Sequence, residues 1–433
     1  MSELSRPNIV FLTIDALRAD HVSCYGYERE TTPILDGFAE DGVRFSHAFS
    51  PSSHTREAIP AMLTGRYPDT CIDASYSLNA TSIAEWLSDT GYATGAFHSN
   101  PYISRAFGFD TGFDTFDDDL HLSNHKFIAL AQRALDKLRN RHYADAETIT
   151  NRARSFLNST TTPFFLWVHY MDPHGPYCPP DAYQALYHGE SVDQKRASRL
   201  YKRAAVSDPA SITEVERQEM LDLYDGEIRY TDDQIGVLLN ELRELNAYNE
   251  SLILISSDHG DAFGEHAYFG HPRRLDQELL HIPLLLQAPD IEARKIRTPV
   301  STLDIVPTIM DSVHSGDTGD GSELPGKSLF TQAEEPEQNR VVYSQVRSED
   351  GSRRRFSARS VDGARFIEWT VGVESDEDEI VNEWGDGPDD LHRQLRQHSQ
   401  HRIANVSGDG DRLVEPEESA RIDQRLEALG YKE

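Results

Sequence analysis

Lysine is scarce in this 433-residue chain, in which only 7 of the 42 basic residues are lysine and 35 are arginine. Acidic residues number 73, so the formal net charge is −31. A surface this negative repels nucleic-acid phosphates and anionic membranes, and we expect neither as a partner. The acidic residues are spread along the whole chain rather than gathered in one tail, which predicts a halophilic protein.

Cysteine and long apolar runs are scarce as well. The three cysteines (Cys24, Cys71 and Cys178) show neither the spacing of a disulfide framework nor that of a metal site. No apolar run approaches the roughly 20 residues of a membrane-spanning helix, so we expect no transmembrane segment. The first residues, MSELSRPNIVF, lack the basic and then apolar pattern of a secretory signal. These features predict a cytoplasmic protein.

The chain is organised around residues 50–68, SPSSHTREAIPAMLTGRYP, where a hydroxyl-rich loop runs into a helix-like segment. Ser52, Ser53 and Thr55 crowd the point where the helix is expected to begin. The free N–H groups of a helix start attract anions and can lower the pKa of a group placed there. An ordinary N-cap is the alternative interpretation, because Ser and Thr are common caps.

Two apolar runs of the sequence each end at polar residues. Residues 8–14 (NIVFLTI) end at Asp15, and residues 251–257 (SLILISS) end at Asp258 and His259. Each run predicts a buried parallel strand with a carboxylate at its carboxyl end. Ligand sites of open α/β sheets lie at those ends, so we expect the three side chains to converge on one crevice that the hydroxyl loop closes.

The remaining pattern predicts an α/β fold, a doubly wound and mostly parallel sheet flanked by helices, over residues 1–340. Further strands are expected at 92–97, 163–169 and 281–287, and helices at 81–89 and 214–246. Residues 341–433 predict a small C-terminal α+β subdomain with antiparallel strands at 341–346, 356–361 and 365–370 and a helix at 418–429.

Two polar segments are harder to place in this fold. The acidic segment 107–119, FGFDTGFDTFDDD, does not have the ligand spacing of a calcium loop, and we interpret it as a solvated turn. Residues 180–215 are polar and uneven, and we expect a surface excursion over the site that shapes the substrate pocket.

Four blocks of the sequence resemble, in order, those of the sulfatase family within the alkaline-phosphatase superfamily. They are IDALRADHVSCYGY, SHTREAIPAMLTGRYP, HYMDPHGPY and SSDHGDAFGEHAYFGH, with a weaker likeness at the C-terminal RLEALGY. The resemblance implies a metal-dependent hydrolase of sulfate or phosphate esters. It makes Asp15, Asp258 and His259 ligands of one divalent ion, and this oxygen-rich set suits Mn²⁺, Ca²⁺, Mg²⁺ or Zn²⁺.

The nucleophile position departs from the family pattern. Sulfatases proper carry Cys or Ser at the head of a Cys/Ser-x-Pro-x-Arg motif and oxidise it to formylglycine. Counting back from the Leu-Thr-Gly at 63–65 places Thr55 in that position, also in contact with the metal, whereas counting back from Arg56 places Ser52 there but leaves the spacing to the helix three residues too long. We therefore predict Thr55 as the nucleophile, with no formylglycine, as in the phosphodiesterase and phosphoglycerol-transferase branches that the loop resembles.

The resemblance also implies roles for residues around the nucleophile. His174 and His271 are expected to hold substrate oxygens or to assist the leaving group, and Arg56 to steady the loop or the anion unless it is an ordinary surface arginine. Asn100 stands where sulfatases have a lysine, so we expect a weaker substrate contact there. Asp172 with His174 and His271 is an alternative site for a second ion. Three further residues are expected in outer or turn positions: Asp20, His21 and His266.

The predicted function is hydrolysis of a sulfate, phosphate or phosphonate ester of a small molecule, glycan or lipid through a covalent intermediate on Thr55. A threonine ester lacks the second hydroxyl by which a formylglycine hydrate expels sulfate, so water has to attack sulfur or phosphorus directly. We therefore expect phosphodiester or phosphonate esters to react faster than sulfate esters. The alternatives are a phosphoglycerol-type transferase acting on a sugar or lipid hydroxyl, and a binding protein without catalysis.

Overall fold

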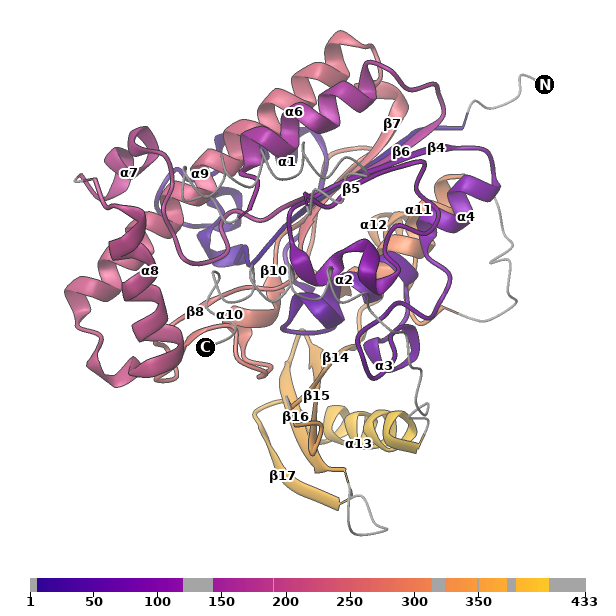
Figure 1. Ribbon diagram of the computed structural model, residues 1–433. Coiled ribbons are helices and arrows are strands. Elements are labelled where there is room, and N and C mark those ends of the chain that lie inside the picture. The colour runs from indigo at the N-terminus through magenta and orange to yellow at the C-terminus, as the bar shows by residue number, and fades with distance from the viewer. Residues whose placement is uncertain are drawn as a thin grey trace.

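A large eight-stranded sheet forms the centre of the protein (Figure 1). The computed structural model describes residues 6–119, 143–189, 191–313, 324–348, 350–371 and 379–404, and the helix predicted at 418–429 lies outside them. In sheet order the strands are β12 Arg294–Ile296, β2 Val43–Phe45, β11 Leu284–Gln287, β7 Ser251–Ser257, β1 Asn8–Ile14, β6 Phe164–Tyr170, β4 Ala93–Phe97 and β5 Thr115–Asp117.

The register of β1 fixes where the site is built. β1 is parallel to both β7 and β6, and Ile14 pairs with Ser257 on one side and Tyr170 on the other. The residues that follow these three strands therefore leave the sheet at one edge. β4 and β5 continue the parallel arrangement, whereas β11 is antiparallel to β7 and β2. All seven residues of β1 are buried, as expected for a strand covered on both faces.

Helices cover both faces of the sheet, which confirms the predicted doubly wound α/β class (Figure 1). Val10 and Leu12 pack with α1 Pro33–Asp41, α6 Ala146–Leu157 and α9 Glu214–Glu244. Ile9 and Phe11, which alternate with them, pack on the other face with α2 Thr55–Thr64, α4 Ile83–Asp89, α11 Ile305–Ser312 and α12 Leu329–Glu334. None of the described helices, not even the 31-residue α9, is apolar enough to cross a membrane.

Local sequence signals define the ends of these helices. α4 begins after Ser82, whose hydroxyl accepts the N–H of Glu85 while the Glu85 carboxylate accepts the N–H of Ser82, a complete capping box. α2 ends at Gly65, which adopts a left-handed φ of 67°. A Cβ atom at this glycine would lie 2.9 Å from the Cβ of Val306 on α11, so both the turn and the packing of α2 on α11 require glycine here.

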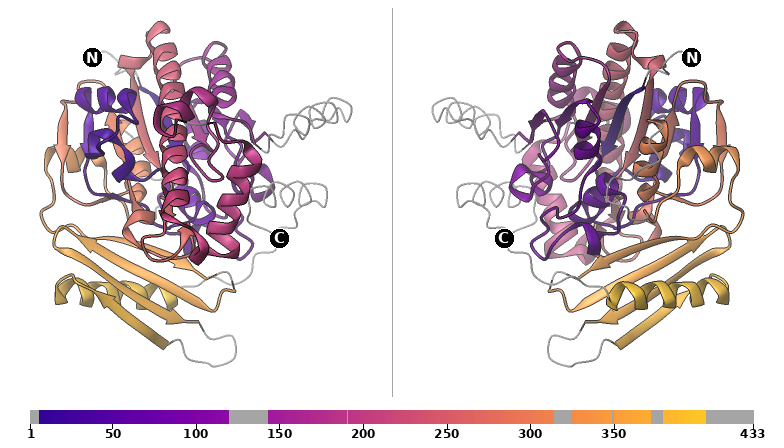
Figure 2. Two further views of the ribbon diagram at one scale, coloured as in Figure 1. Left: turned by 90° about the vertical axis from the view of Figure 1, so that its left-hand side faces the viewer. Right: turned by 90° about the vertical axis from the view of Figure 1, so that its right-hand side faces the viewer.

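A smaller antiparallel sheet lies against the large domain (Figure 2). It comprises β14 Val342–Arg347, β15 Arg353–Ser360, β16 Gly363–Thr370 and β17 Glu379–Gly385. Helix α13, Asp389–Ala404, covers one face through Leu391 and Leu395, which pack with Phe356 and Ile367. At the other side Val342 and Val346 pack with residues of the large domain. The boundary that the sequence predicts near residue 340, between the large domain and the C-terminal subdomain, stays a prediction.

The interpretation of residues 107–119 as a solvated turn is wrong, because β5 pairs with β4 there as the edge strand of the main sheet. Its acidic residues hid the strand. Arg105 pairs with Asp118 at 3.0 Å, and Arg152 pairs with Asp117 at 3.0 Å and Asp119 at 2.8 Å. These two guanidinium groups neutralise carboxylates that would otherwise oppose strand pairing and burial.

The polar segment 180–215 is largely helical rather than an irregular excursion. It contains α7 Asp181–Tyr187 and α8 Gln194–Lys202. Leu200 and Tyr201 of α8 are buried in the core on the face of α9, so the segment is anchored to the large domain.

Candidate active site

Two carboxylates and an imidazole converge at the carboxyl edge of the sheet. Asp15 follows β1, Asp258 and His259 follow β7, and all three side chains are fully buried. Their ligand atoms lie within 4.8 Å of one another. The Nε2 atom of His259 is 3.7 Å from Oδ1 of Asp15 and 3.5 Å from Oδ2 of Asp258. The structure thus brings together the three residues that the sequence predicts.

The two carboxylates each leave one oxygen without a hydrogen bond. Oδ2 of Asp15 accepts the Asn100 amide at 2.7 Å, and Oδ1 of Asp258 accepts the N–H of His259 at 2.8 Å. Oδ1 of Asp15 and Oδ2 of Asp258 are buried without a hydrogen-bond partner. Two buried, unpaired carboxylate oxygens are costly, and one divalent cation would satisfy both. The residues present therefore fit a metal ion with oxygen ligands and one imidazole.

The charge environment of the two carboxylates is suited to binding a cation. Burial and then the charge of Asp15 raise the pKa of Asp258. Burial also opposes ionisation of Asp15, but His174, His169 and His259 together outweigh it and hold the pKa of Asp15 below its usual range. Two carboxylates this close do not both ionise readily without a positive charge between them.

The first residue of α2 faces this centre. Oγ1 of Thr55 lies 3.0 Å from Nε2 of His259, and the threonine is 1% exposed. The hydroxyl of Ser52 instead donates to Oε2 of Glu57 at 3.0 Å. A Ser52 nucleophile would have to give up this buried bond, whereas the Thr55 hydroxyl already lies beside the unpaired oxygens. The geometry therefore favours the register that places Thr55 at the nucleophile position.

Four imidazole rings, including that of His259 beside Thr55, form a cluster. The ring centre of His271 lies 4.5 Å from that of His259, 4.9 Å from that of His174 and 5.7 Å from that of His54. The first three were singled out from the sequence, and His54 was not. Because His54 is the N-cap of α2, its ring is carried into the cluster by the same turn that places Thr55.

Hydrogen bonds orient the two histidines that are candidates for proton transfer. Nδ1 of His271 is 3.1 Å from Oδ1 of Asp261, whose other oxygen accepts the Tyr177 hydroxyl. Nδ1 of His174 is 2.7 Å from the carbonyl oxygen of Gly175. In a neutral ring each bond places the proton on Nδ1 and the lone pair on Nε2. Burial and then the charge of His259 lower the pKa of His271 to about 4, so this ring is a neutral base at neutral pH.

Arg56 is packed among aromatic rings rather than against a carboxylate. Its guanidinium carbon lies 3.9 Å from the ring centre of Tyr76 and 4.8 Å from that of Tyr102. Across the described part of the chain no acceptor hydrogen-bonds this guanidinium, and its Nε is buried without a partner. Burial lowers the pKa of Arg56. A half-buried cation next to Thr55 in the chain and without a protein anion is suited to binding an anionic ligand.

Two more guanidinium groups lie around the same tyrosine ring. Arg347 is 3.7 Å and Arg273 is 5.6 Å from the ring centre of Tyr76. Both pair with one carboxylate, Glu57, at 3.8 and 2.8 Å. With Arg56 they form a cluster of three arginines and one acid. This arginine cluster makes the region beside the nucleophile locally positive in a chain whose net charge is −31.

The structure gives Asn100 a clear structural task. Its amide N–H donates to Asp15, and its oxygen accepts the N–H of Tyr102 at 2.9 Å. Asn100 therefore orients the Asp15 carboxylate, and its contact with substrate stays a prediction.

No support emerges for a second ion at Asp172. Its Oδ2 accepts the N–H of Ala146 at 2.8 Å, which ties the carboxylate to the start of α6. Within the described ranges, Asp15, Asp258 and His259 are the one group with the proximity of metal ligands. The three residues expected in outer or turn positions pair elsewhere: Asp20 with Arg18, His21 with Asp225, and His266 with Glu278.

Two residues that complete the site were not singled out from the sequence. His169, near the end of β6, places Nε2 at 3.2 Å from Oδ2 of Asp15. Asp261 orients His271. His169 could have been predicted from the sequence. Residues 163–169 were already expected to form a buried strand, and a polar residue near the end of such a strand indicates a site. Asp261 lies in the quoted SSDHGDAFGEHAYFGH block, but nothing in that block indicated which histidine it would contact.

A doubly wound sheet with a carboxylate, imidazole and hydroxyl centre at its carboxyl edge defines an ester hydrolase of the alkaline-phosphatase type. The family model described as Sulfatase matches residues 7–315. The chain belongs to the sulfatase family. It is 27% identical over 384 residues to the uncharacterized sulfatase YidJ of Escherichia coli K12, and the match covers 81% of this chain and 75% of YidJ.

Two solved structures share the fold across nearly the whole chain. One is BT4656 in complex with its substrate D-glucosamine-2-N,6-O-disulfate, with a TM-score of 0.71 and 17% identity, covering 92% of this chain and 99% of that one. The other is the phosphonate monoester hydrolase of Agrobacterium radiobacter, with a TM-score of 0.68 and 16% identity, covering 99% of this chain and 98% of that one.

Proposed function

We propose that this protein is a metal-dependent hydrolase of anionic esters that acts through a covalent intermediate on Thr55. The observation that carries the proposal is the 3.0 Å approach of Thr55 Oγ1 to Nε2 of His259, beside the two unpaired oxygens of Asp15 and Asp258. A divalent ion held by these residues would lower the pKa of a hydroxyl and neutralise charge on the ester.

In the first step the Oγ atom of Thr55 forms a bond to the sulfur or phosphorus of the ester while the bond to the leaving oxygen breaks. The hydroxyl proton ends on the leaving alcohol, and His271, oriented by Asp261, is placed to relay it. In the second step water attacks sulfur or phosphorus and the bond to Oγ breaks. One proton of the water returns to the threonine oxygen, and the other stays with the released anion. His174, whose ring centre lies 4.9 Å from that of His271, is the second candidate for this transfer.

The arginine cluster supports an anionic substrate. Net charge alone would repel such a ligand, but Arg56, Arg273 and Arg347 create a local positive potential beside the nucleophile. Structural neighbours include a sulfatase with a sulfated sugar and a phosphonate hydrolase, so fold similarity is compatible with either ester. The unmodified threonine favours phosphodiester or phosphonate esters, because its ester has no neighbouring hydroxyl to expel sulfate.

Mass spectrometry of the quenched enzyme tests the covalent step. We expect a wild-type fraction heavier by one sulfo or phospho group, on the peptide that contains Thr55, after rapid mixing with an aryl ester and Mn²⁺. The matched control is Thr55→Ser, which keeps the hydroxyl and should still be labelled, whereas Thr55→Ala should not. Label on another residue, or turnover by Thr55→Ala at the wild-type rate, would contradict the proposal. Added alcohol distinguishes transfer from hydrolysis by its products.

A further inference from the structure

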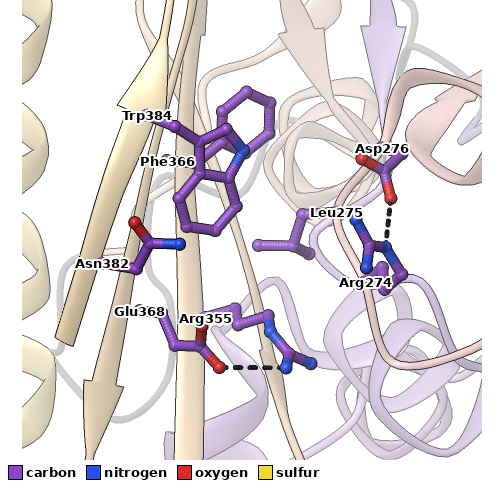
Figure 3. A pocket seen from close by; sticks show the side chains of 8 residues that line it. All are labelled: Arg274, Leu275, Asp276, Arg355, Phe366, Glu368, Asn382 and Trp384. Carbon is purple, nitrogen blue, oxygen red and sulfur yellow. Dashed lines mark hydrogen bonds and ion pairs between the residues drawn. The ribbon is translucent and has the colours of Figure 1, made fainter. Parts of the chain in front are cut away.

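A cavity of about 290 Å³ opens between the C-terminal sheet and the loop that follows His271. Its floor is aromatic. Phe366 on β16 and Trp384 on β17 pair directly across the two strands, with ring centres 5.3 Å apart and planes 7° apart. Trp384 is 37% exposed, and Leu275 closes the opposite side (Figure 3). A flat aromatic surface thus faces the cavity and is partly open to solvent.

Polar groups surround this aromatic floor in paired charges (Figure 3). Arg355 pairs with Glu368 at 2.9 Å on the sheet, and Arg274 pairs with Asp276 at 2.8 Å on the loop. The amide of Asn382 lies across from Glu368 in the β16–β17 pairing. The cavity therefore offers donors and acceptors around an apolar face, without a surplus of either charge.

We infer that this cavity binds one pyranose ring of a glycan. A sugar ring has an apolar C–H face that packs on a flat indole, and hydroxyls that both donate and accept hydrogen bonds. Carboxylates, guanidinium groups and an amide supply the matching partners. The volume lies at the lower end of ligand pockets, roughly 300 Å³ and upward, which suits a single ring. A nucleotide fits less well, because Glu368 and Asp276 repel phosphate.

The sugar site is coupled to the active site by a short segment. Leu275 follows His271 by four residues, so their Cα atoms are at most roughly 14 Å apart. Arg355 donates to the carbonyl oxygen of Arg273, and Arg273 pairs with Glu57 on α2. The inference rests on the proposed ester hydrolysis and specifies its substrate as a glycan ester, with the ester at Thr55 and a neighbouring ring on Trp384.

Kinetics with large and small substrates test the coupling. For Trp384→Ala we expect a roughly tenfold rise in KM for a sulfated or phosphorylated tetrasaccharide, which corresponds to the loss of an aromatic stacking contact of about 1.4 kcal/mol. Hydrolysis of a p-nitrophenyl ester, too small to span both sites, should be unchanged. Trp384→Phe should restore most of the affinity. Val381→Ala is the matched control, since Val381 is 49% exposed on the same strand and does not line the cavity.

Direct binding separates this inference from the proposed function. Tryptophan fluorescence of the wild type should change saturably with uncharged agarotetraose, chitotetraose or cellotetraose, and the change should vanish in Trp384→Phe. If the protein shows this saturable change but cleaves no ester, the sugar site is supported and the proposed function is wrong. Ester cleavage with no saturable response to any of the three sugars, or an unchanged tetrasaccharide KM in Trp384→Ala, would overturn the inference and leave the proposed function standing.

Discussion

The hydroxyl of Thr55 lies 3.0 Å from Nε2 of His259, although 204 positions separate the two residues in the chain. Core packing fixes both ends of this contact. His259 follows β7, which pairs with β1 along its whole length, and Ile59 and Met62 of α2 are buried in the core on the face of the sheet that α4, α11 and α12 also cover. The nucleophile is therefore held by the rigid part of the protein rather than by its loop alone.

Removing the nucleophile should abolish turnover without unfolding the protein. We expect Thr55→Ala to reduce kcat by roughly 10⁴-fold or more, the scale found for removed nucleophiles. Ser52→Ala is the matched control and should keep most activity, because its hydroxyl bonds to Glu57 rather than to the metal ligands. Steady-state rates with an aryl ester and circular dichroism of both variants check this. An inactive Ser52→Ala beside an active Thr55→Ala would mean that the register is wrong.

Removal of the metal should cost both activity and stability. A ligand that binds only the folded state adds about 2.7 kcal/mol at 100 times its Kd, so chelation should lower the unfolding temperature. Asp258→Asn should bind less metal, measured by elemental analysis after gel filtration. Asp290→Asn, an exposed carboxylate remote from the metal ligands in sequence, is the control. A metal-free preparation with full activity would contradict the proposed metal dependence.

Ester preference follows from the nature of the nucleophile. We expect kcat/KM for a p-nitrophenyl phosphodiester or phenylphosphonate to exceed that for p-nitrophenyl sulfate. The three substrates share one leaving group, so the comparison isolates the transferred group. Assays in molar KCl with Mn²⁺ provide the measurement. A tenfold preference for the sulfate would favour an ordinary sulfatase with an unusual nucleophile.

Salt should stabilise the fold. With a net charge of −31, repulsion among surface carboxylates opposes the compact state. At about 1 M salt the screening length falls to roughly 3 Å, and this repulsion largely disappears. We expect the unfolding temperature to rise steeply from dilute buffer to molar KCl. A flat curve over that range contradicts the halophilic interpretation.

The stabilising contribution of the protonated Asp172 carboxyl should fall as the pH rises from about 4 to 7. Burial, then the charge of Asp145, raises the pKa of Asp172 from 3.8 to about 7, and burial raises the pKa of Glu227. Between pH 3.8 and about 7 the Asp172 carboxyl binds more protons in the folded chain than in the unfolded chain, so its deprotonation favours unfolding and its contribution is lost as the pH rises through about 7. Asp172→Asn should flatten this slope in thermal unfolding between pH 5 and 8, whereas Asp290→Asn should not. The same pH dependence in the wild type and in Asp172→Asn would refute the prediction.

The sequence predicted the parts of the fold that depend on local pattern. β1 and β7 coincide with the predicted runs 8–14 and 251–257, because buried parallel strands are continuously apolar. β5 was missed because its carboxylates are neutralised by Arg105 and Arg152, partners that no local pattern reveals.

The same limit applies to the site. Asp15, Asp258 and His259 could be predicted because they directly follow buried apolar strands. His54 was not, because its place among the other imidazoles depends on how α2 docks against the sheet. The arginine cluster also escaped prediction, since Tyr76 collects guanidinium groups from three separate segments.

Residues 271–276 contribute to three places in the structure. The imidazole of His271 lies beside His259, the guanidinium of Arg273 pairs with Glu57, and Leu275 lines the proposed sugar cavity. In evolutionary terms this segment cannot change length freely, because a single insertion would displace His271 from the reacting ester. The aromatic floor on β16 and β17 carries no such constraint. Relatives that act on different glycans should therefore differ by substitutions at Phe366, Asn382 and Trp384. The loop beside these residues should have the same length in all of them.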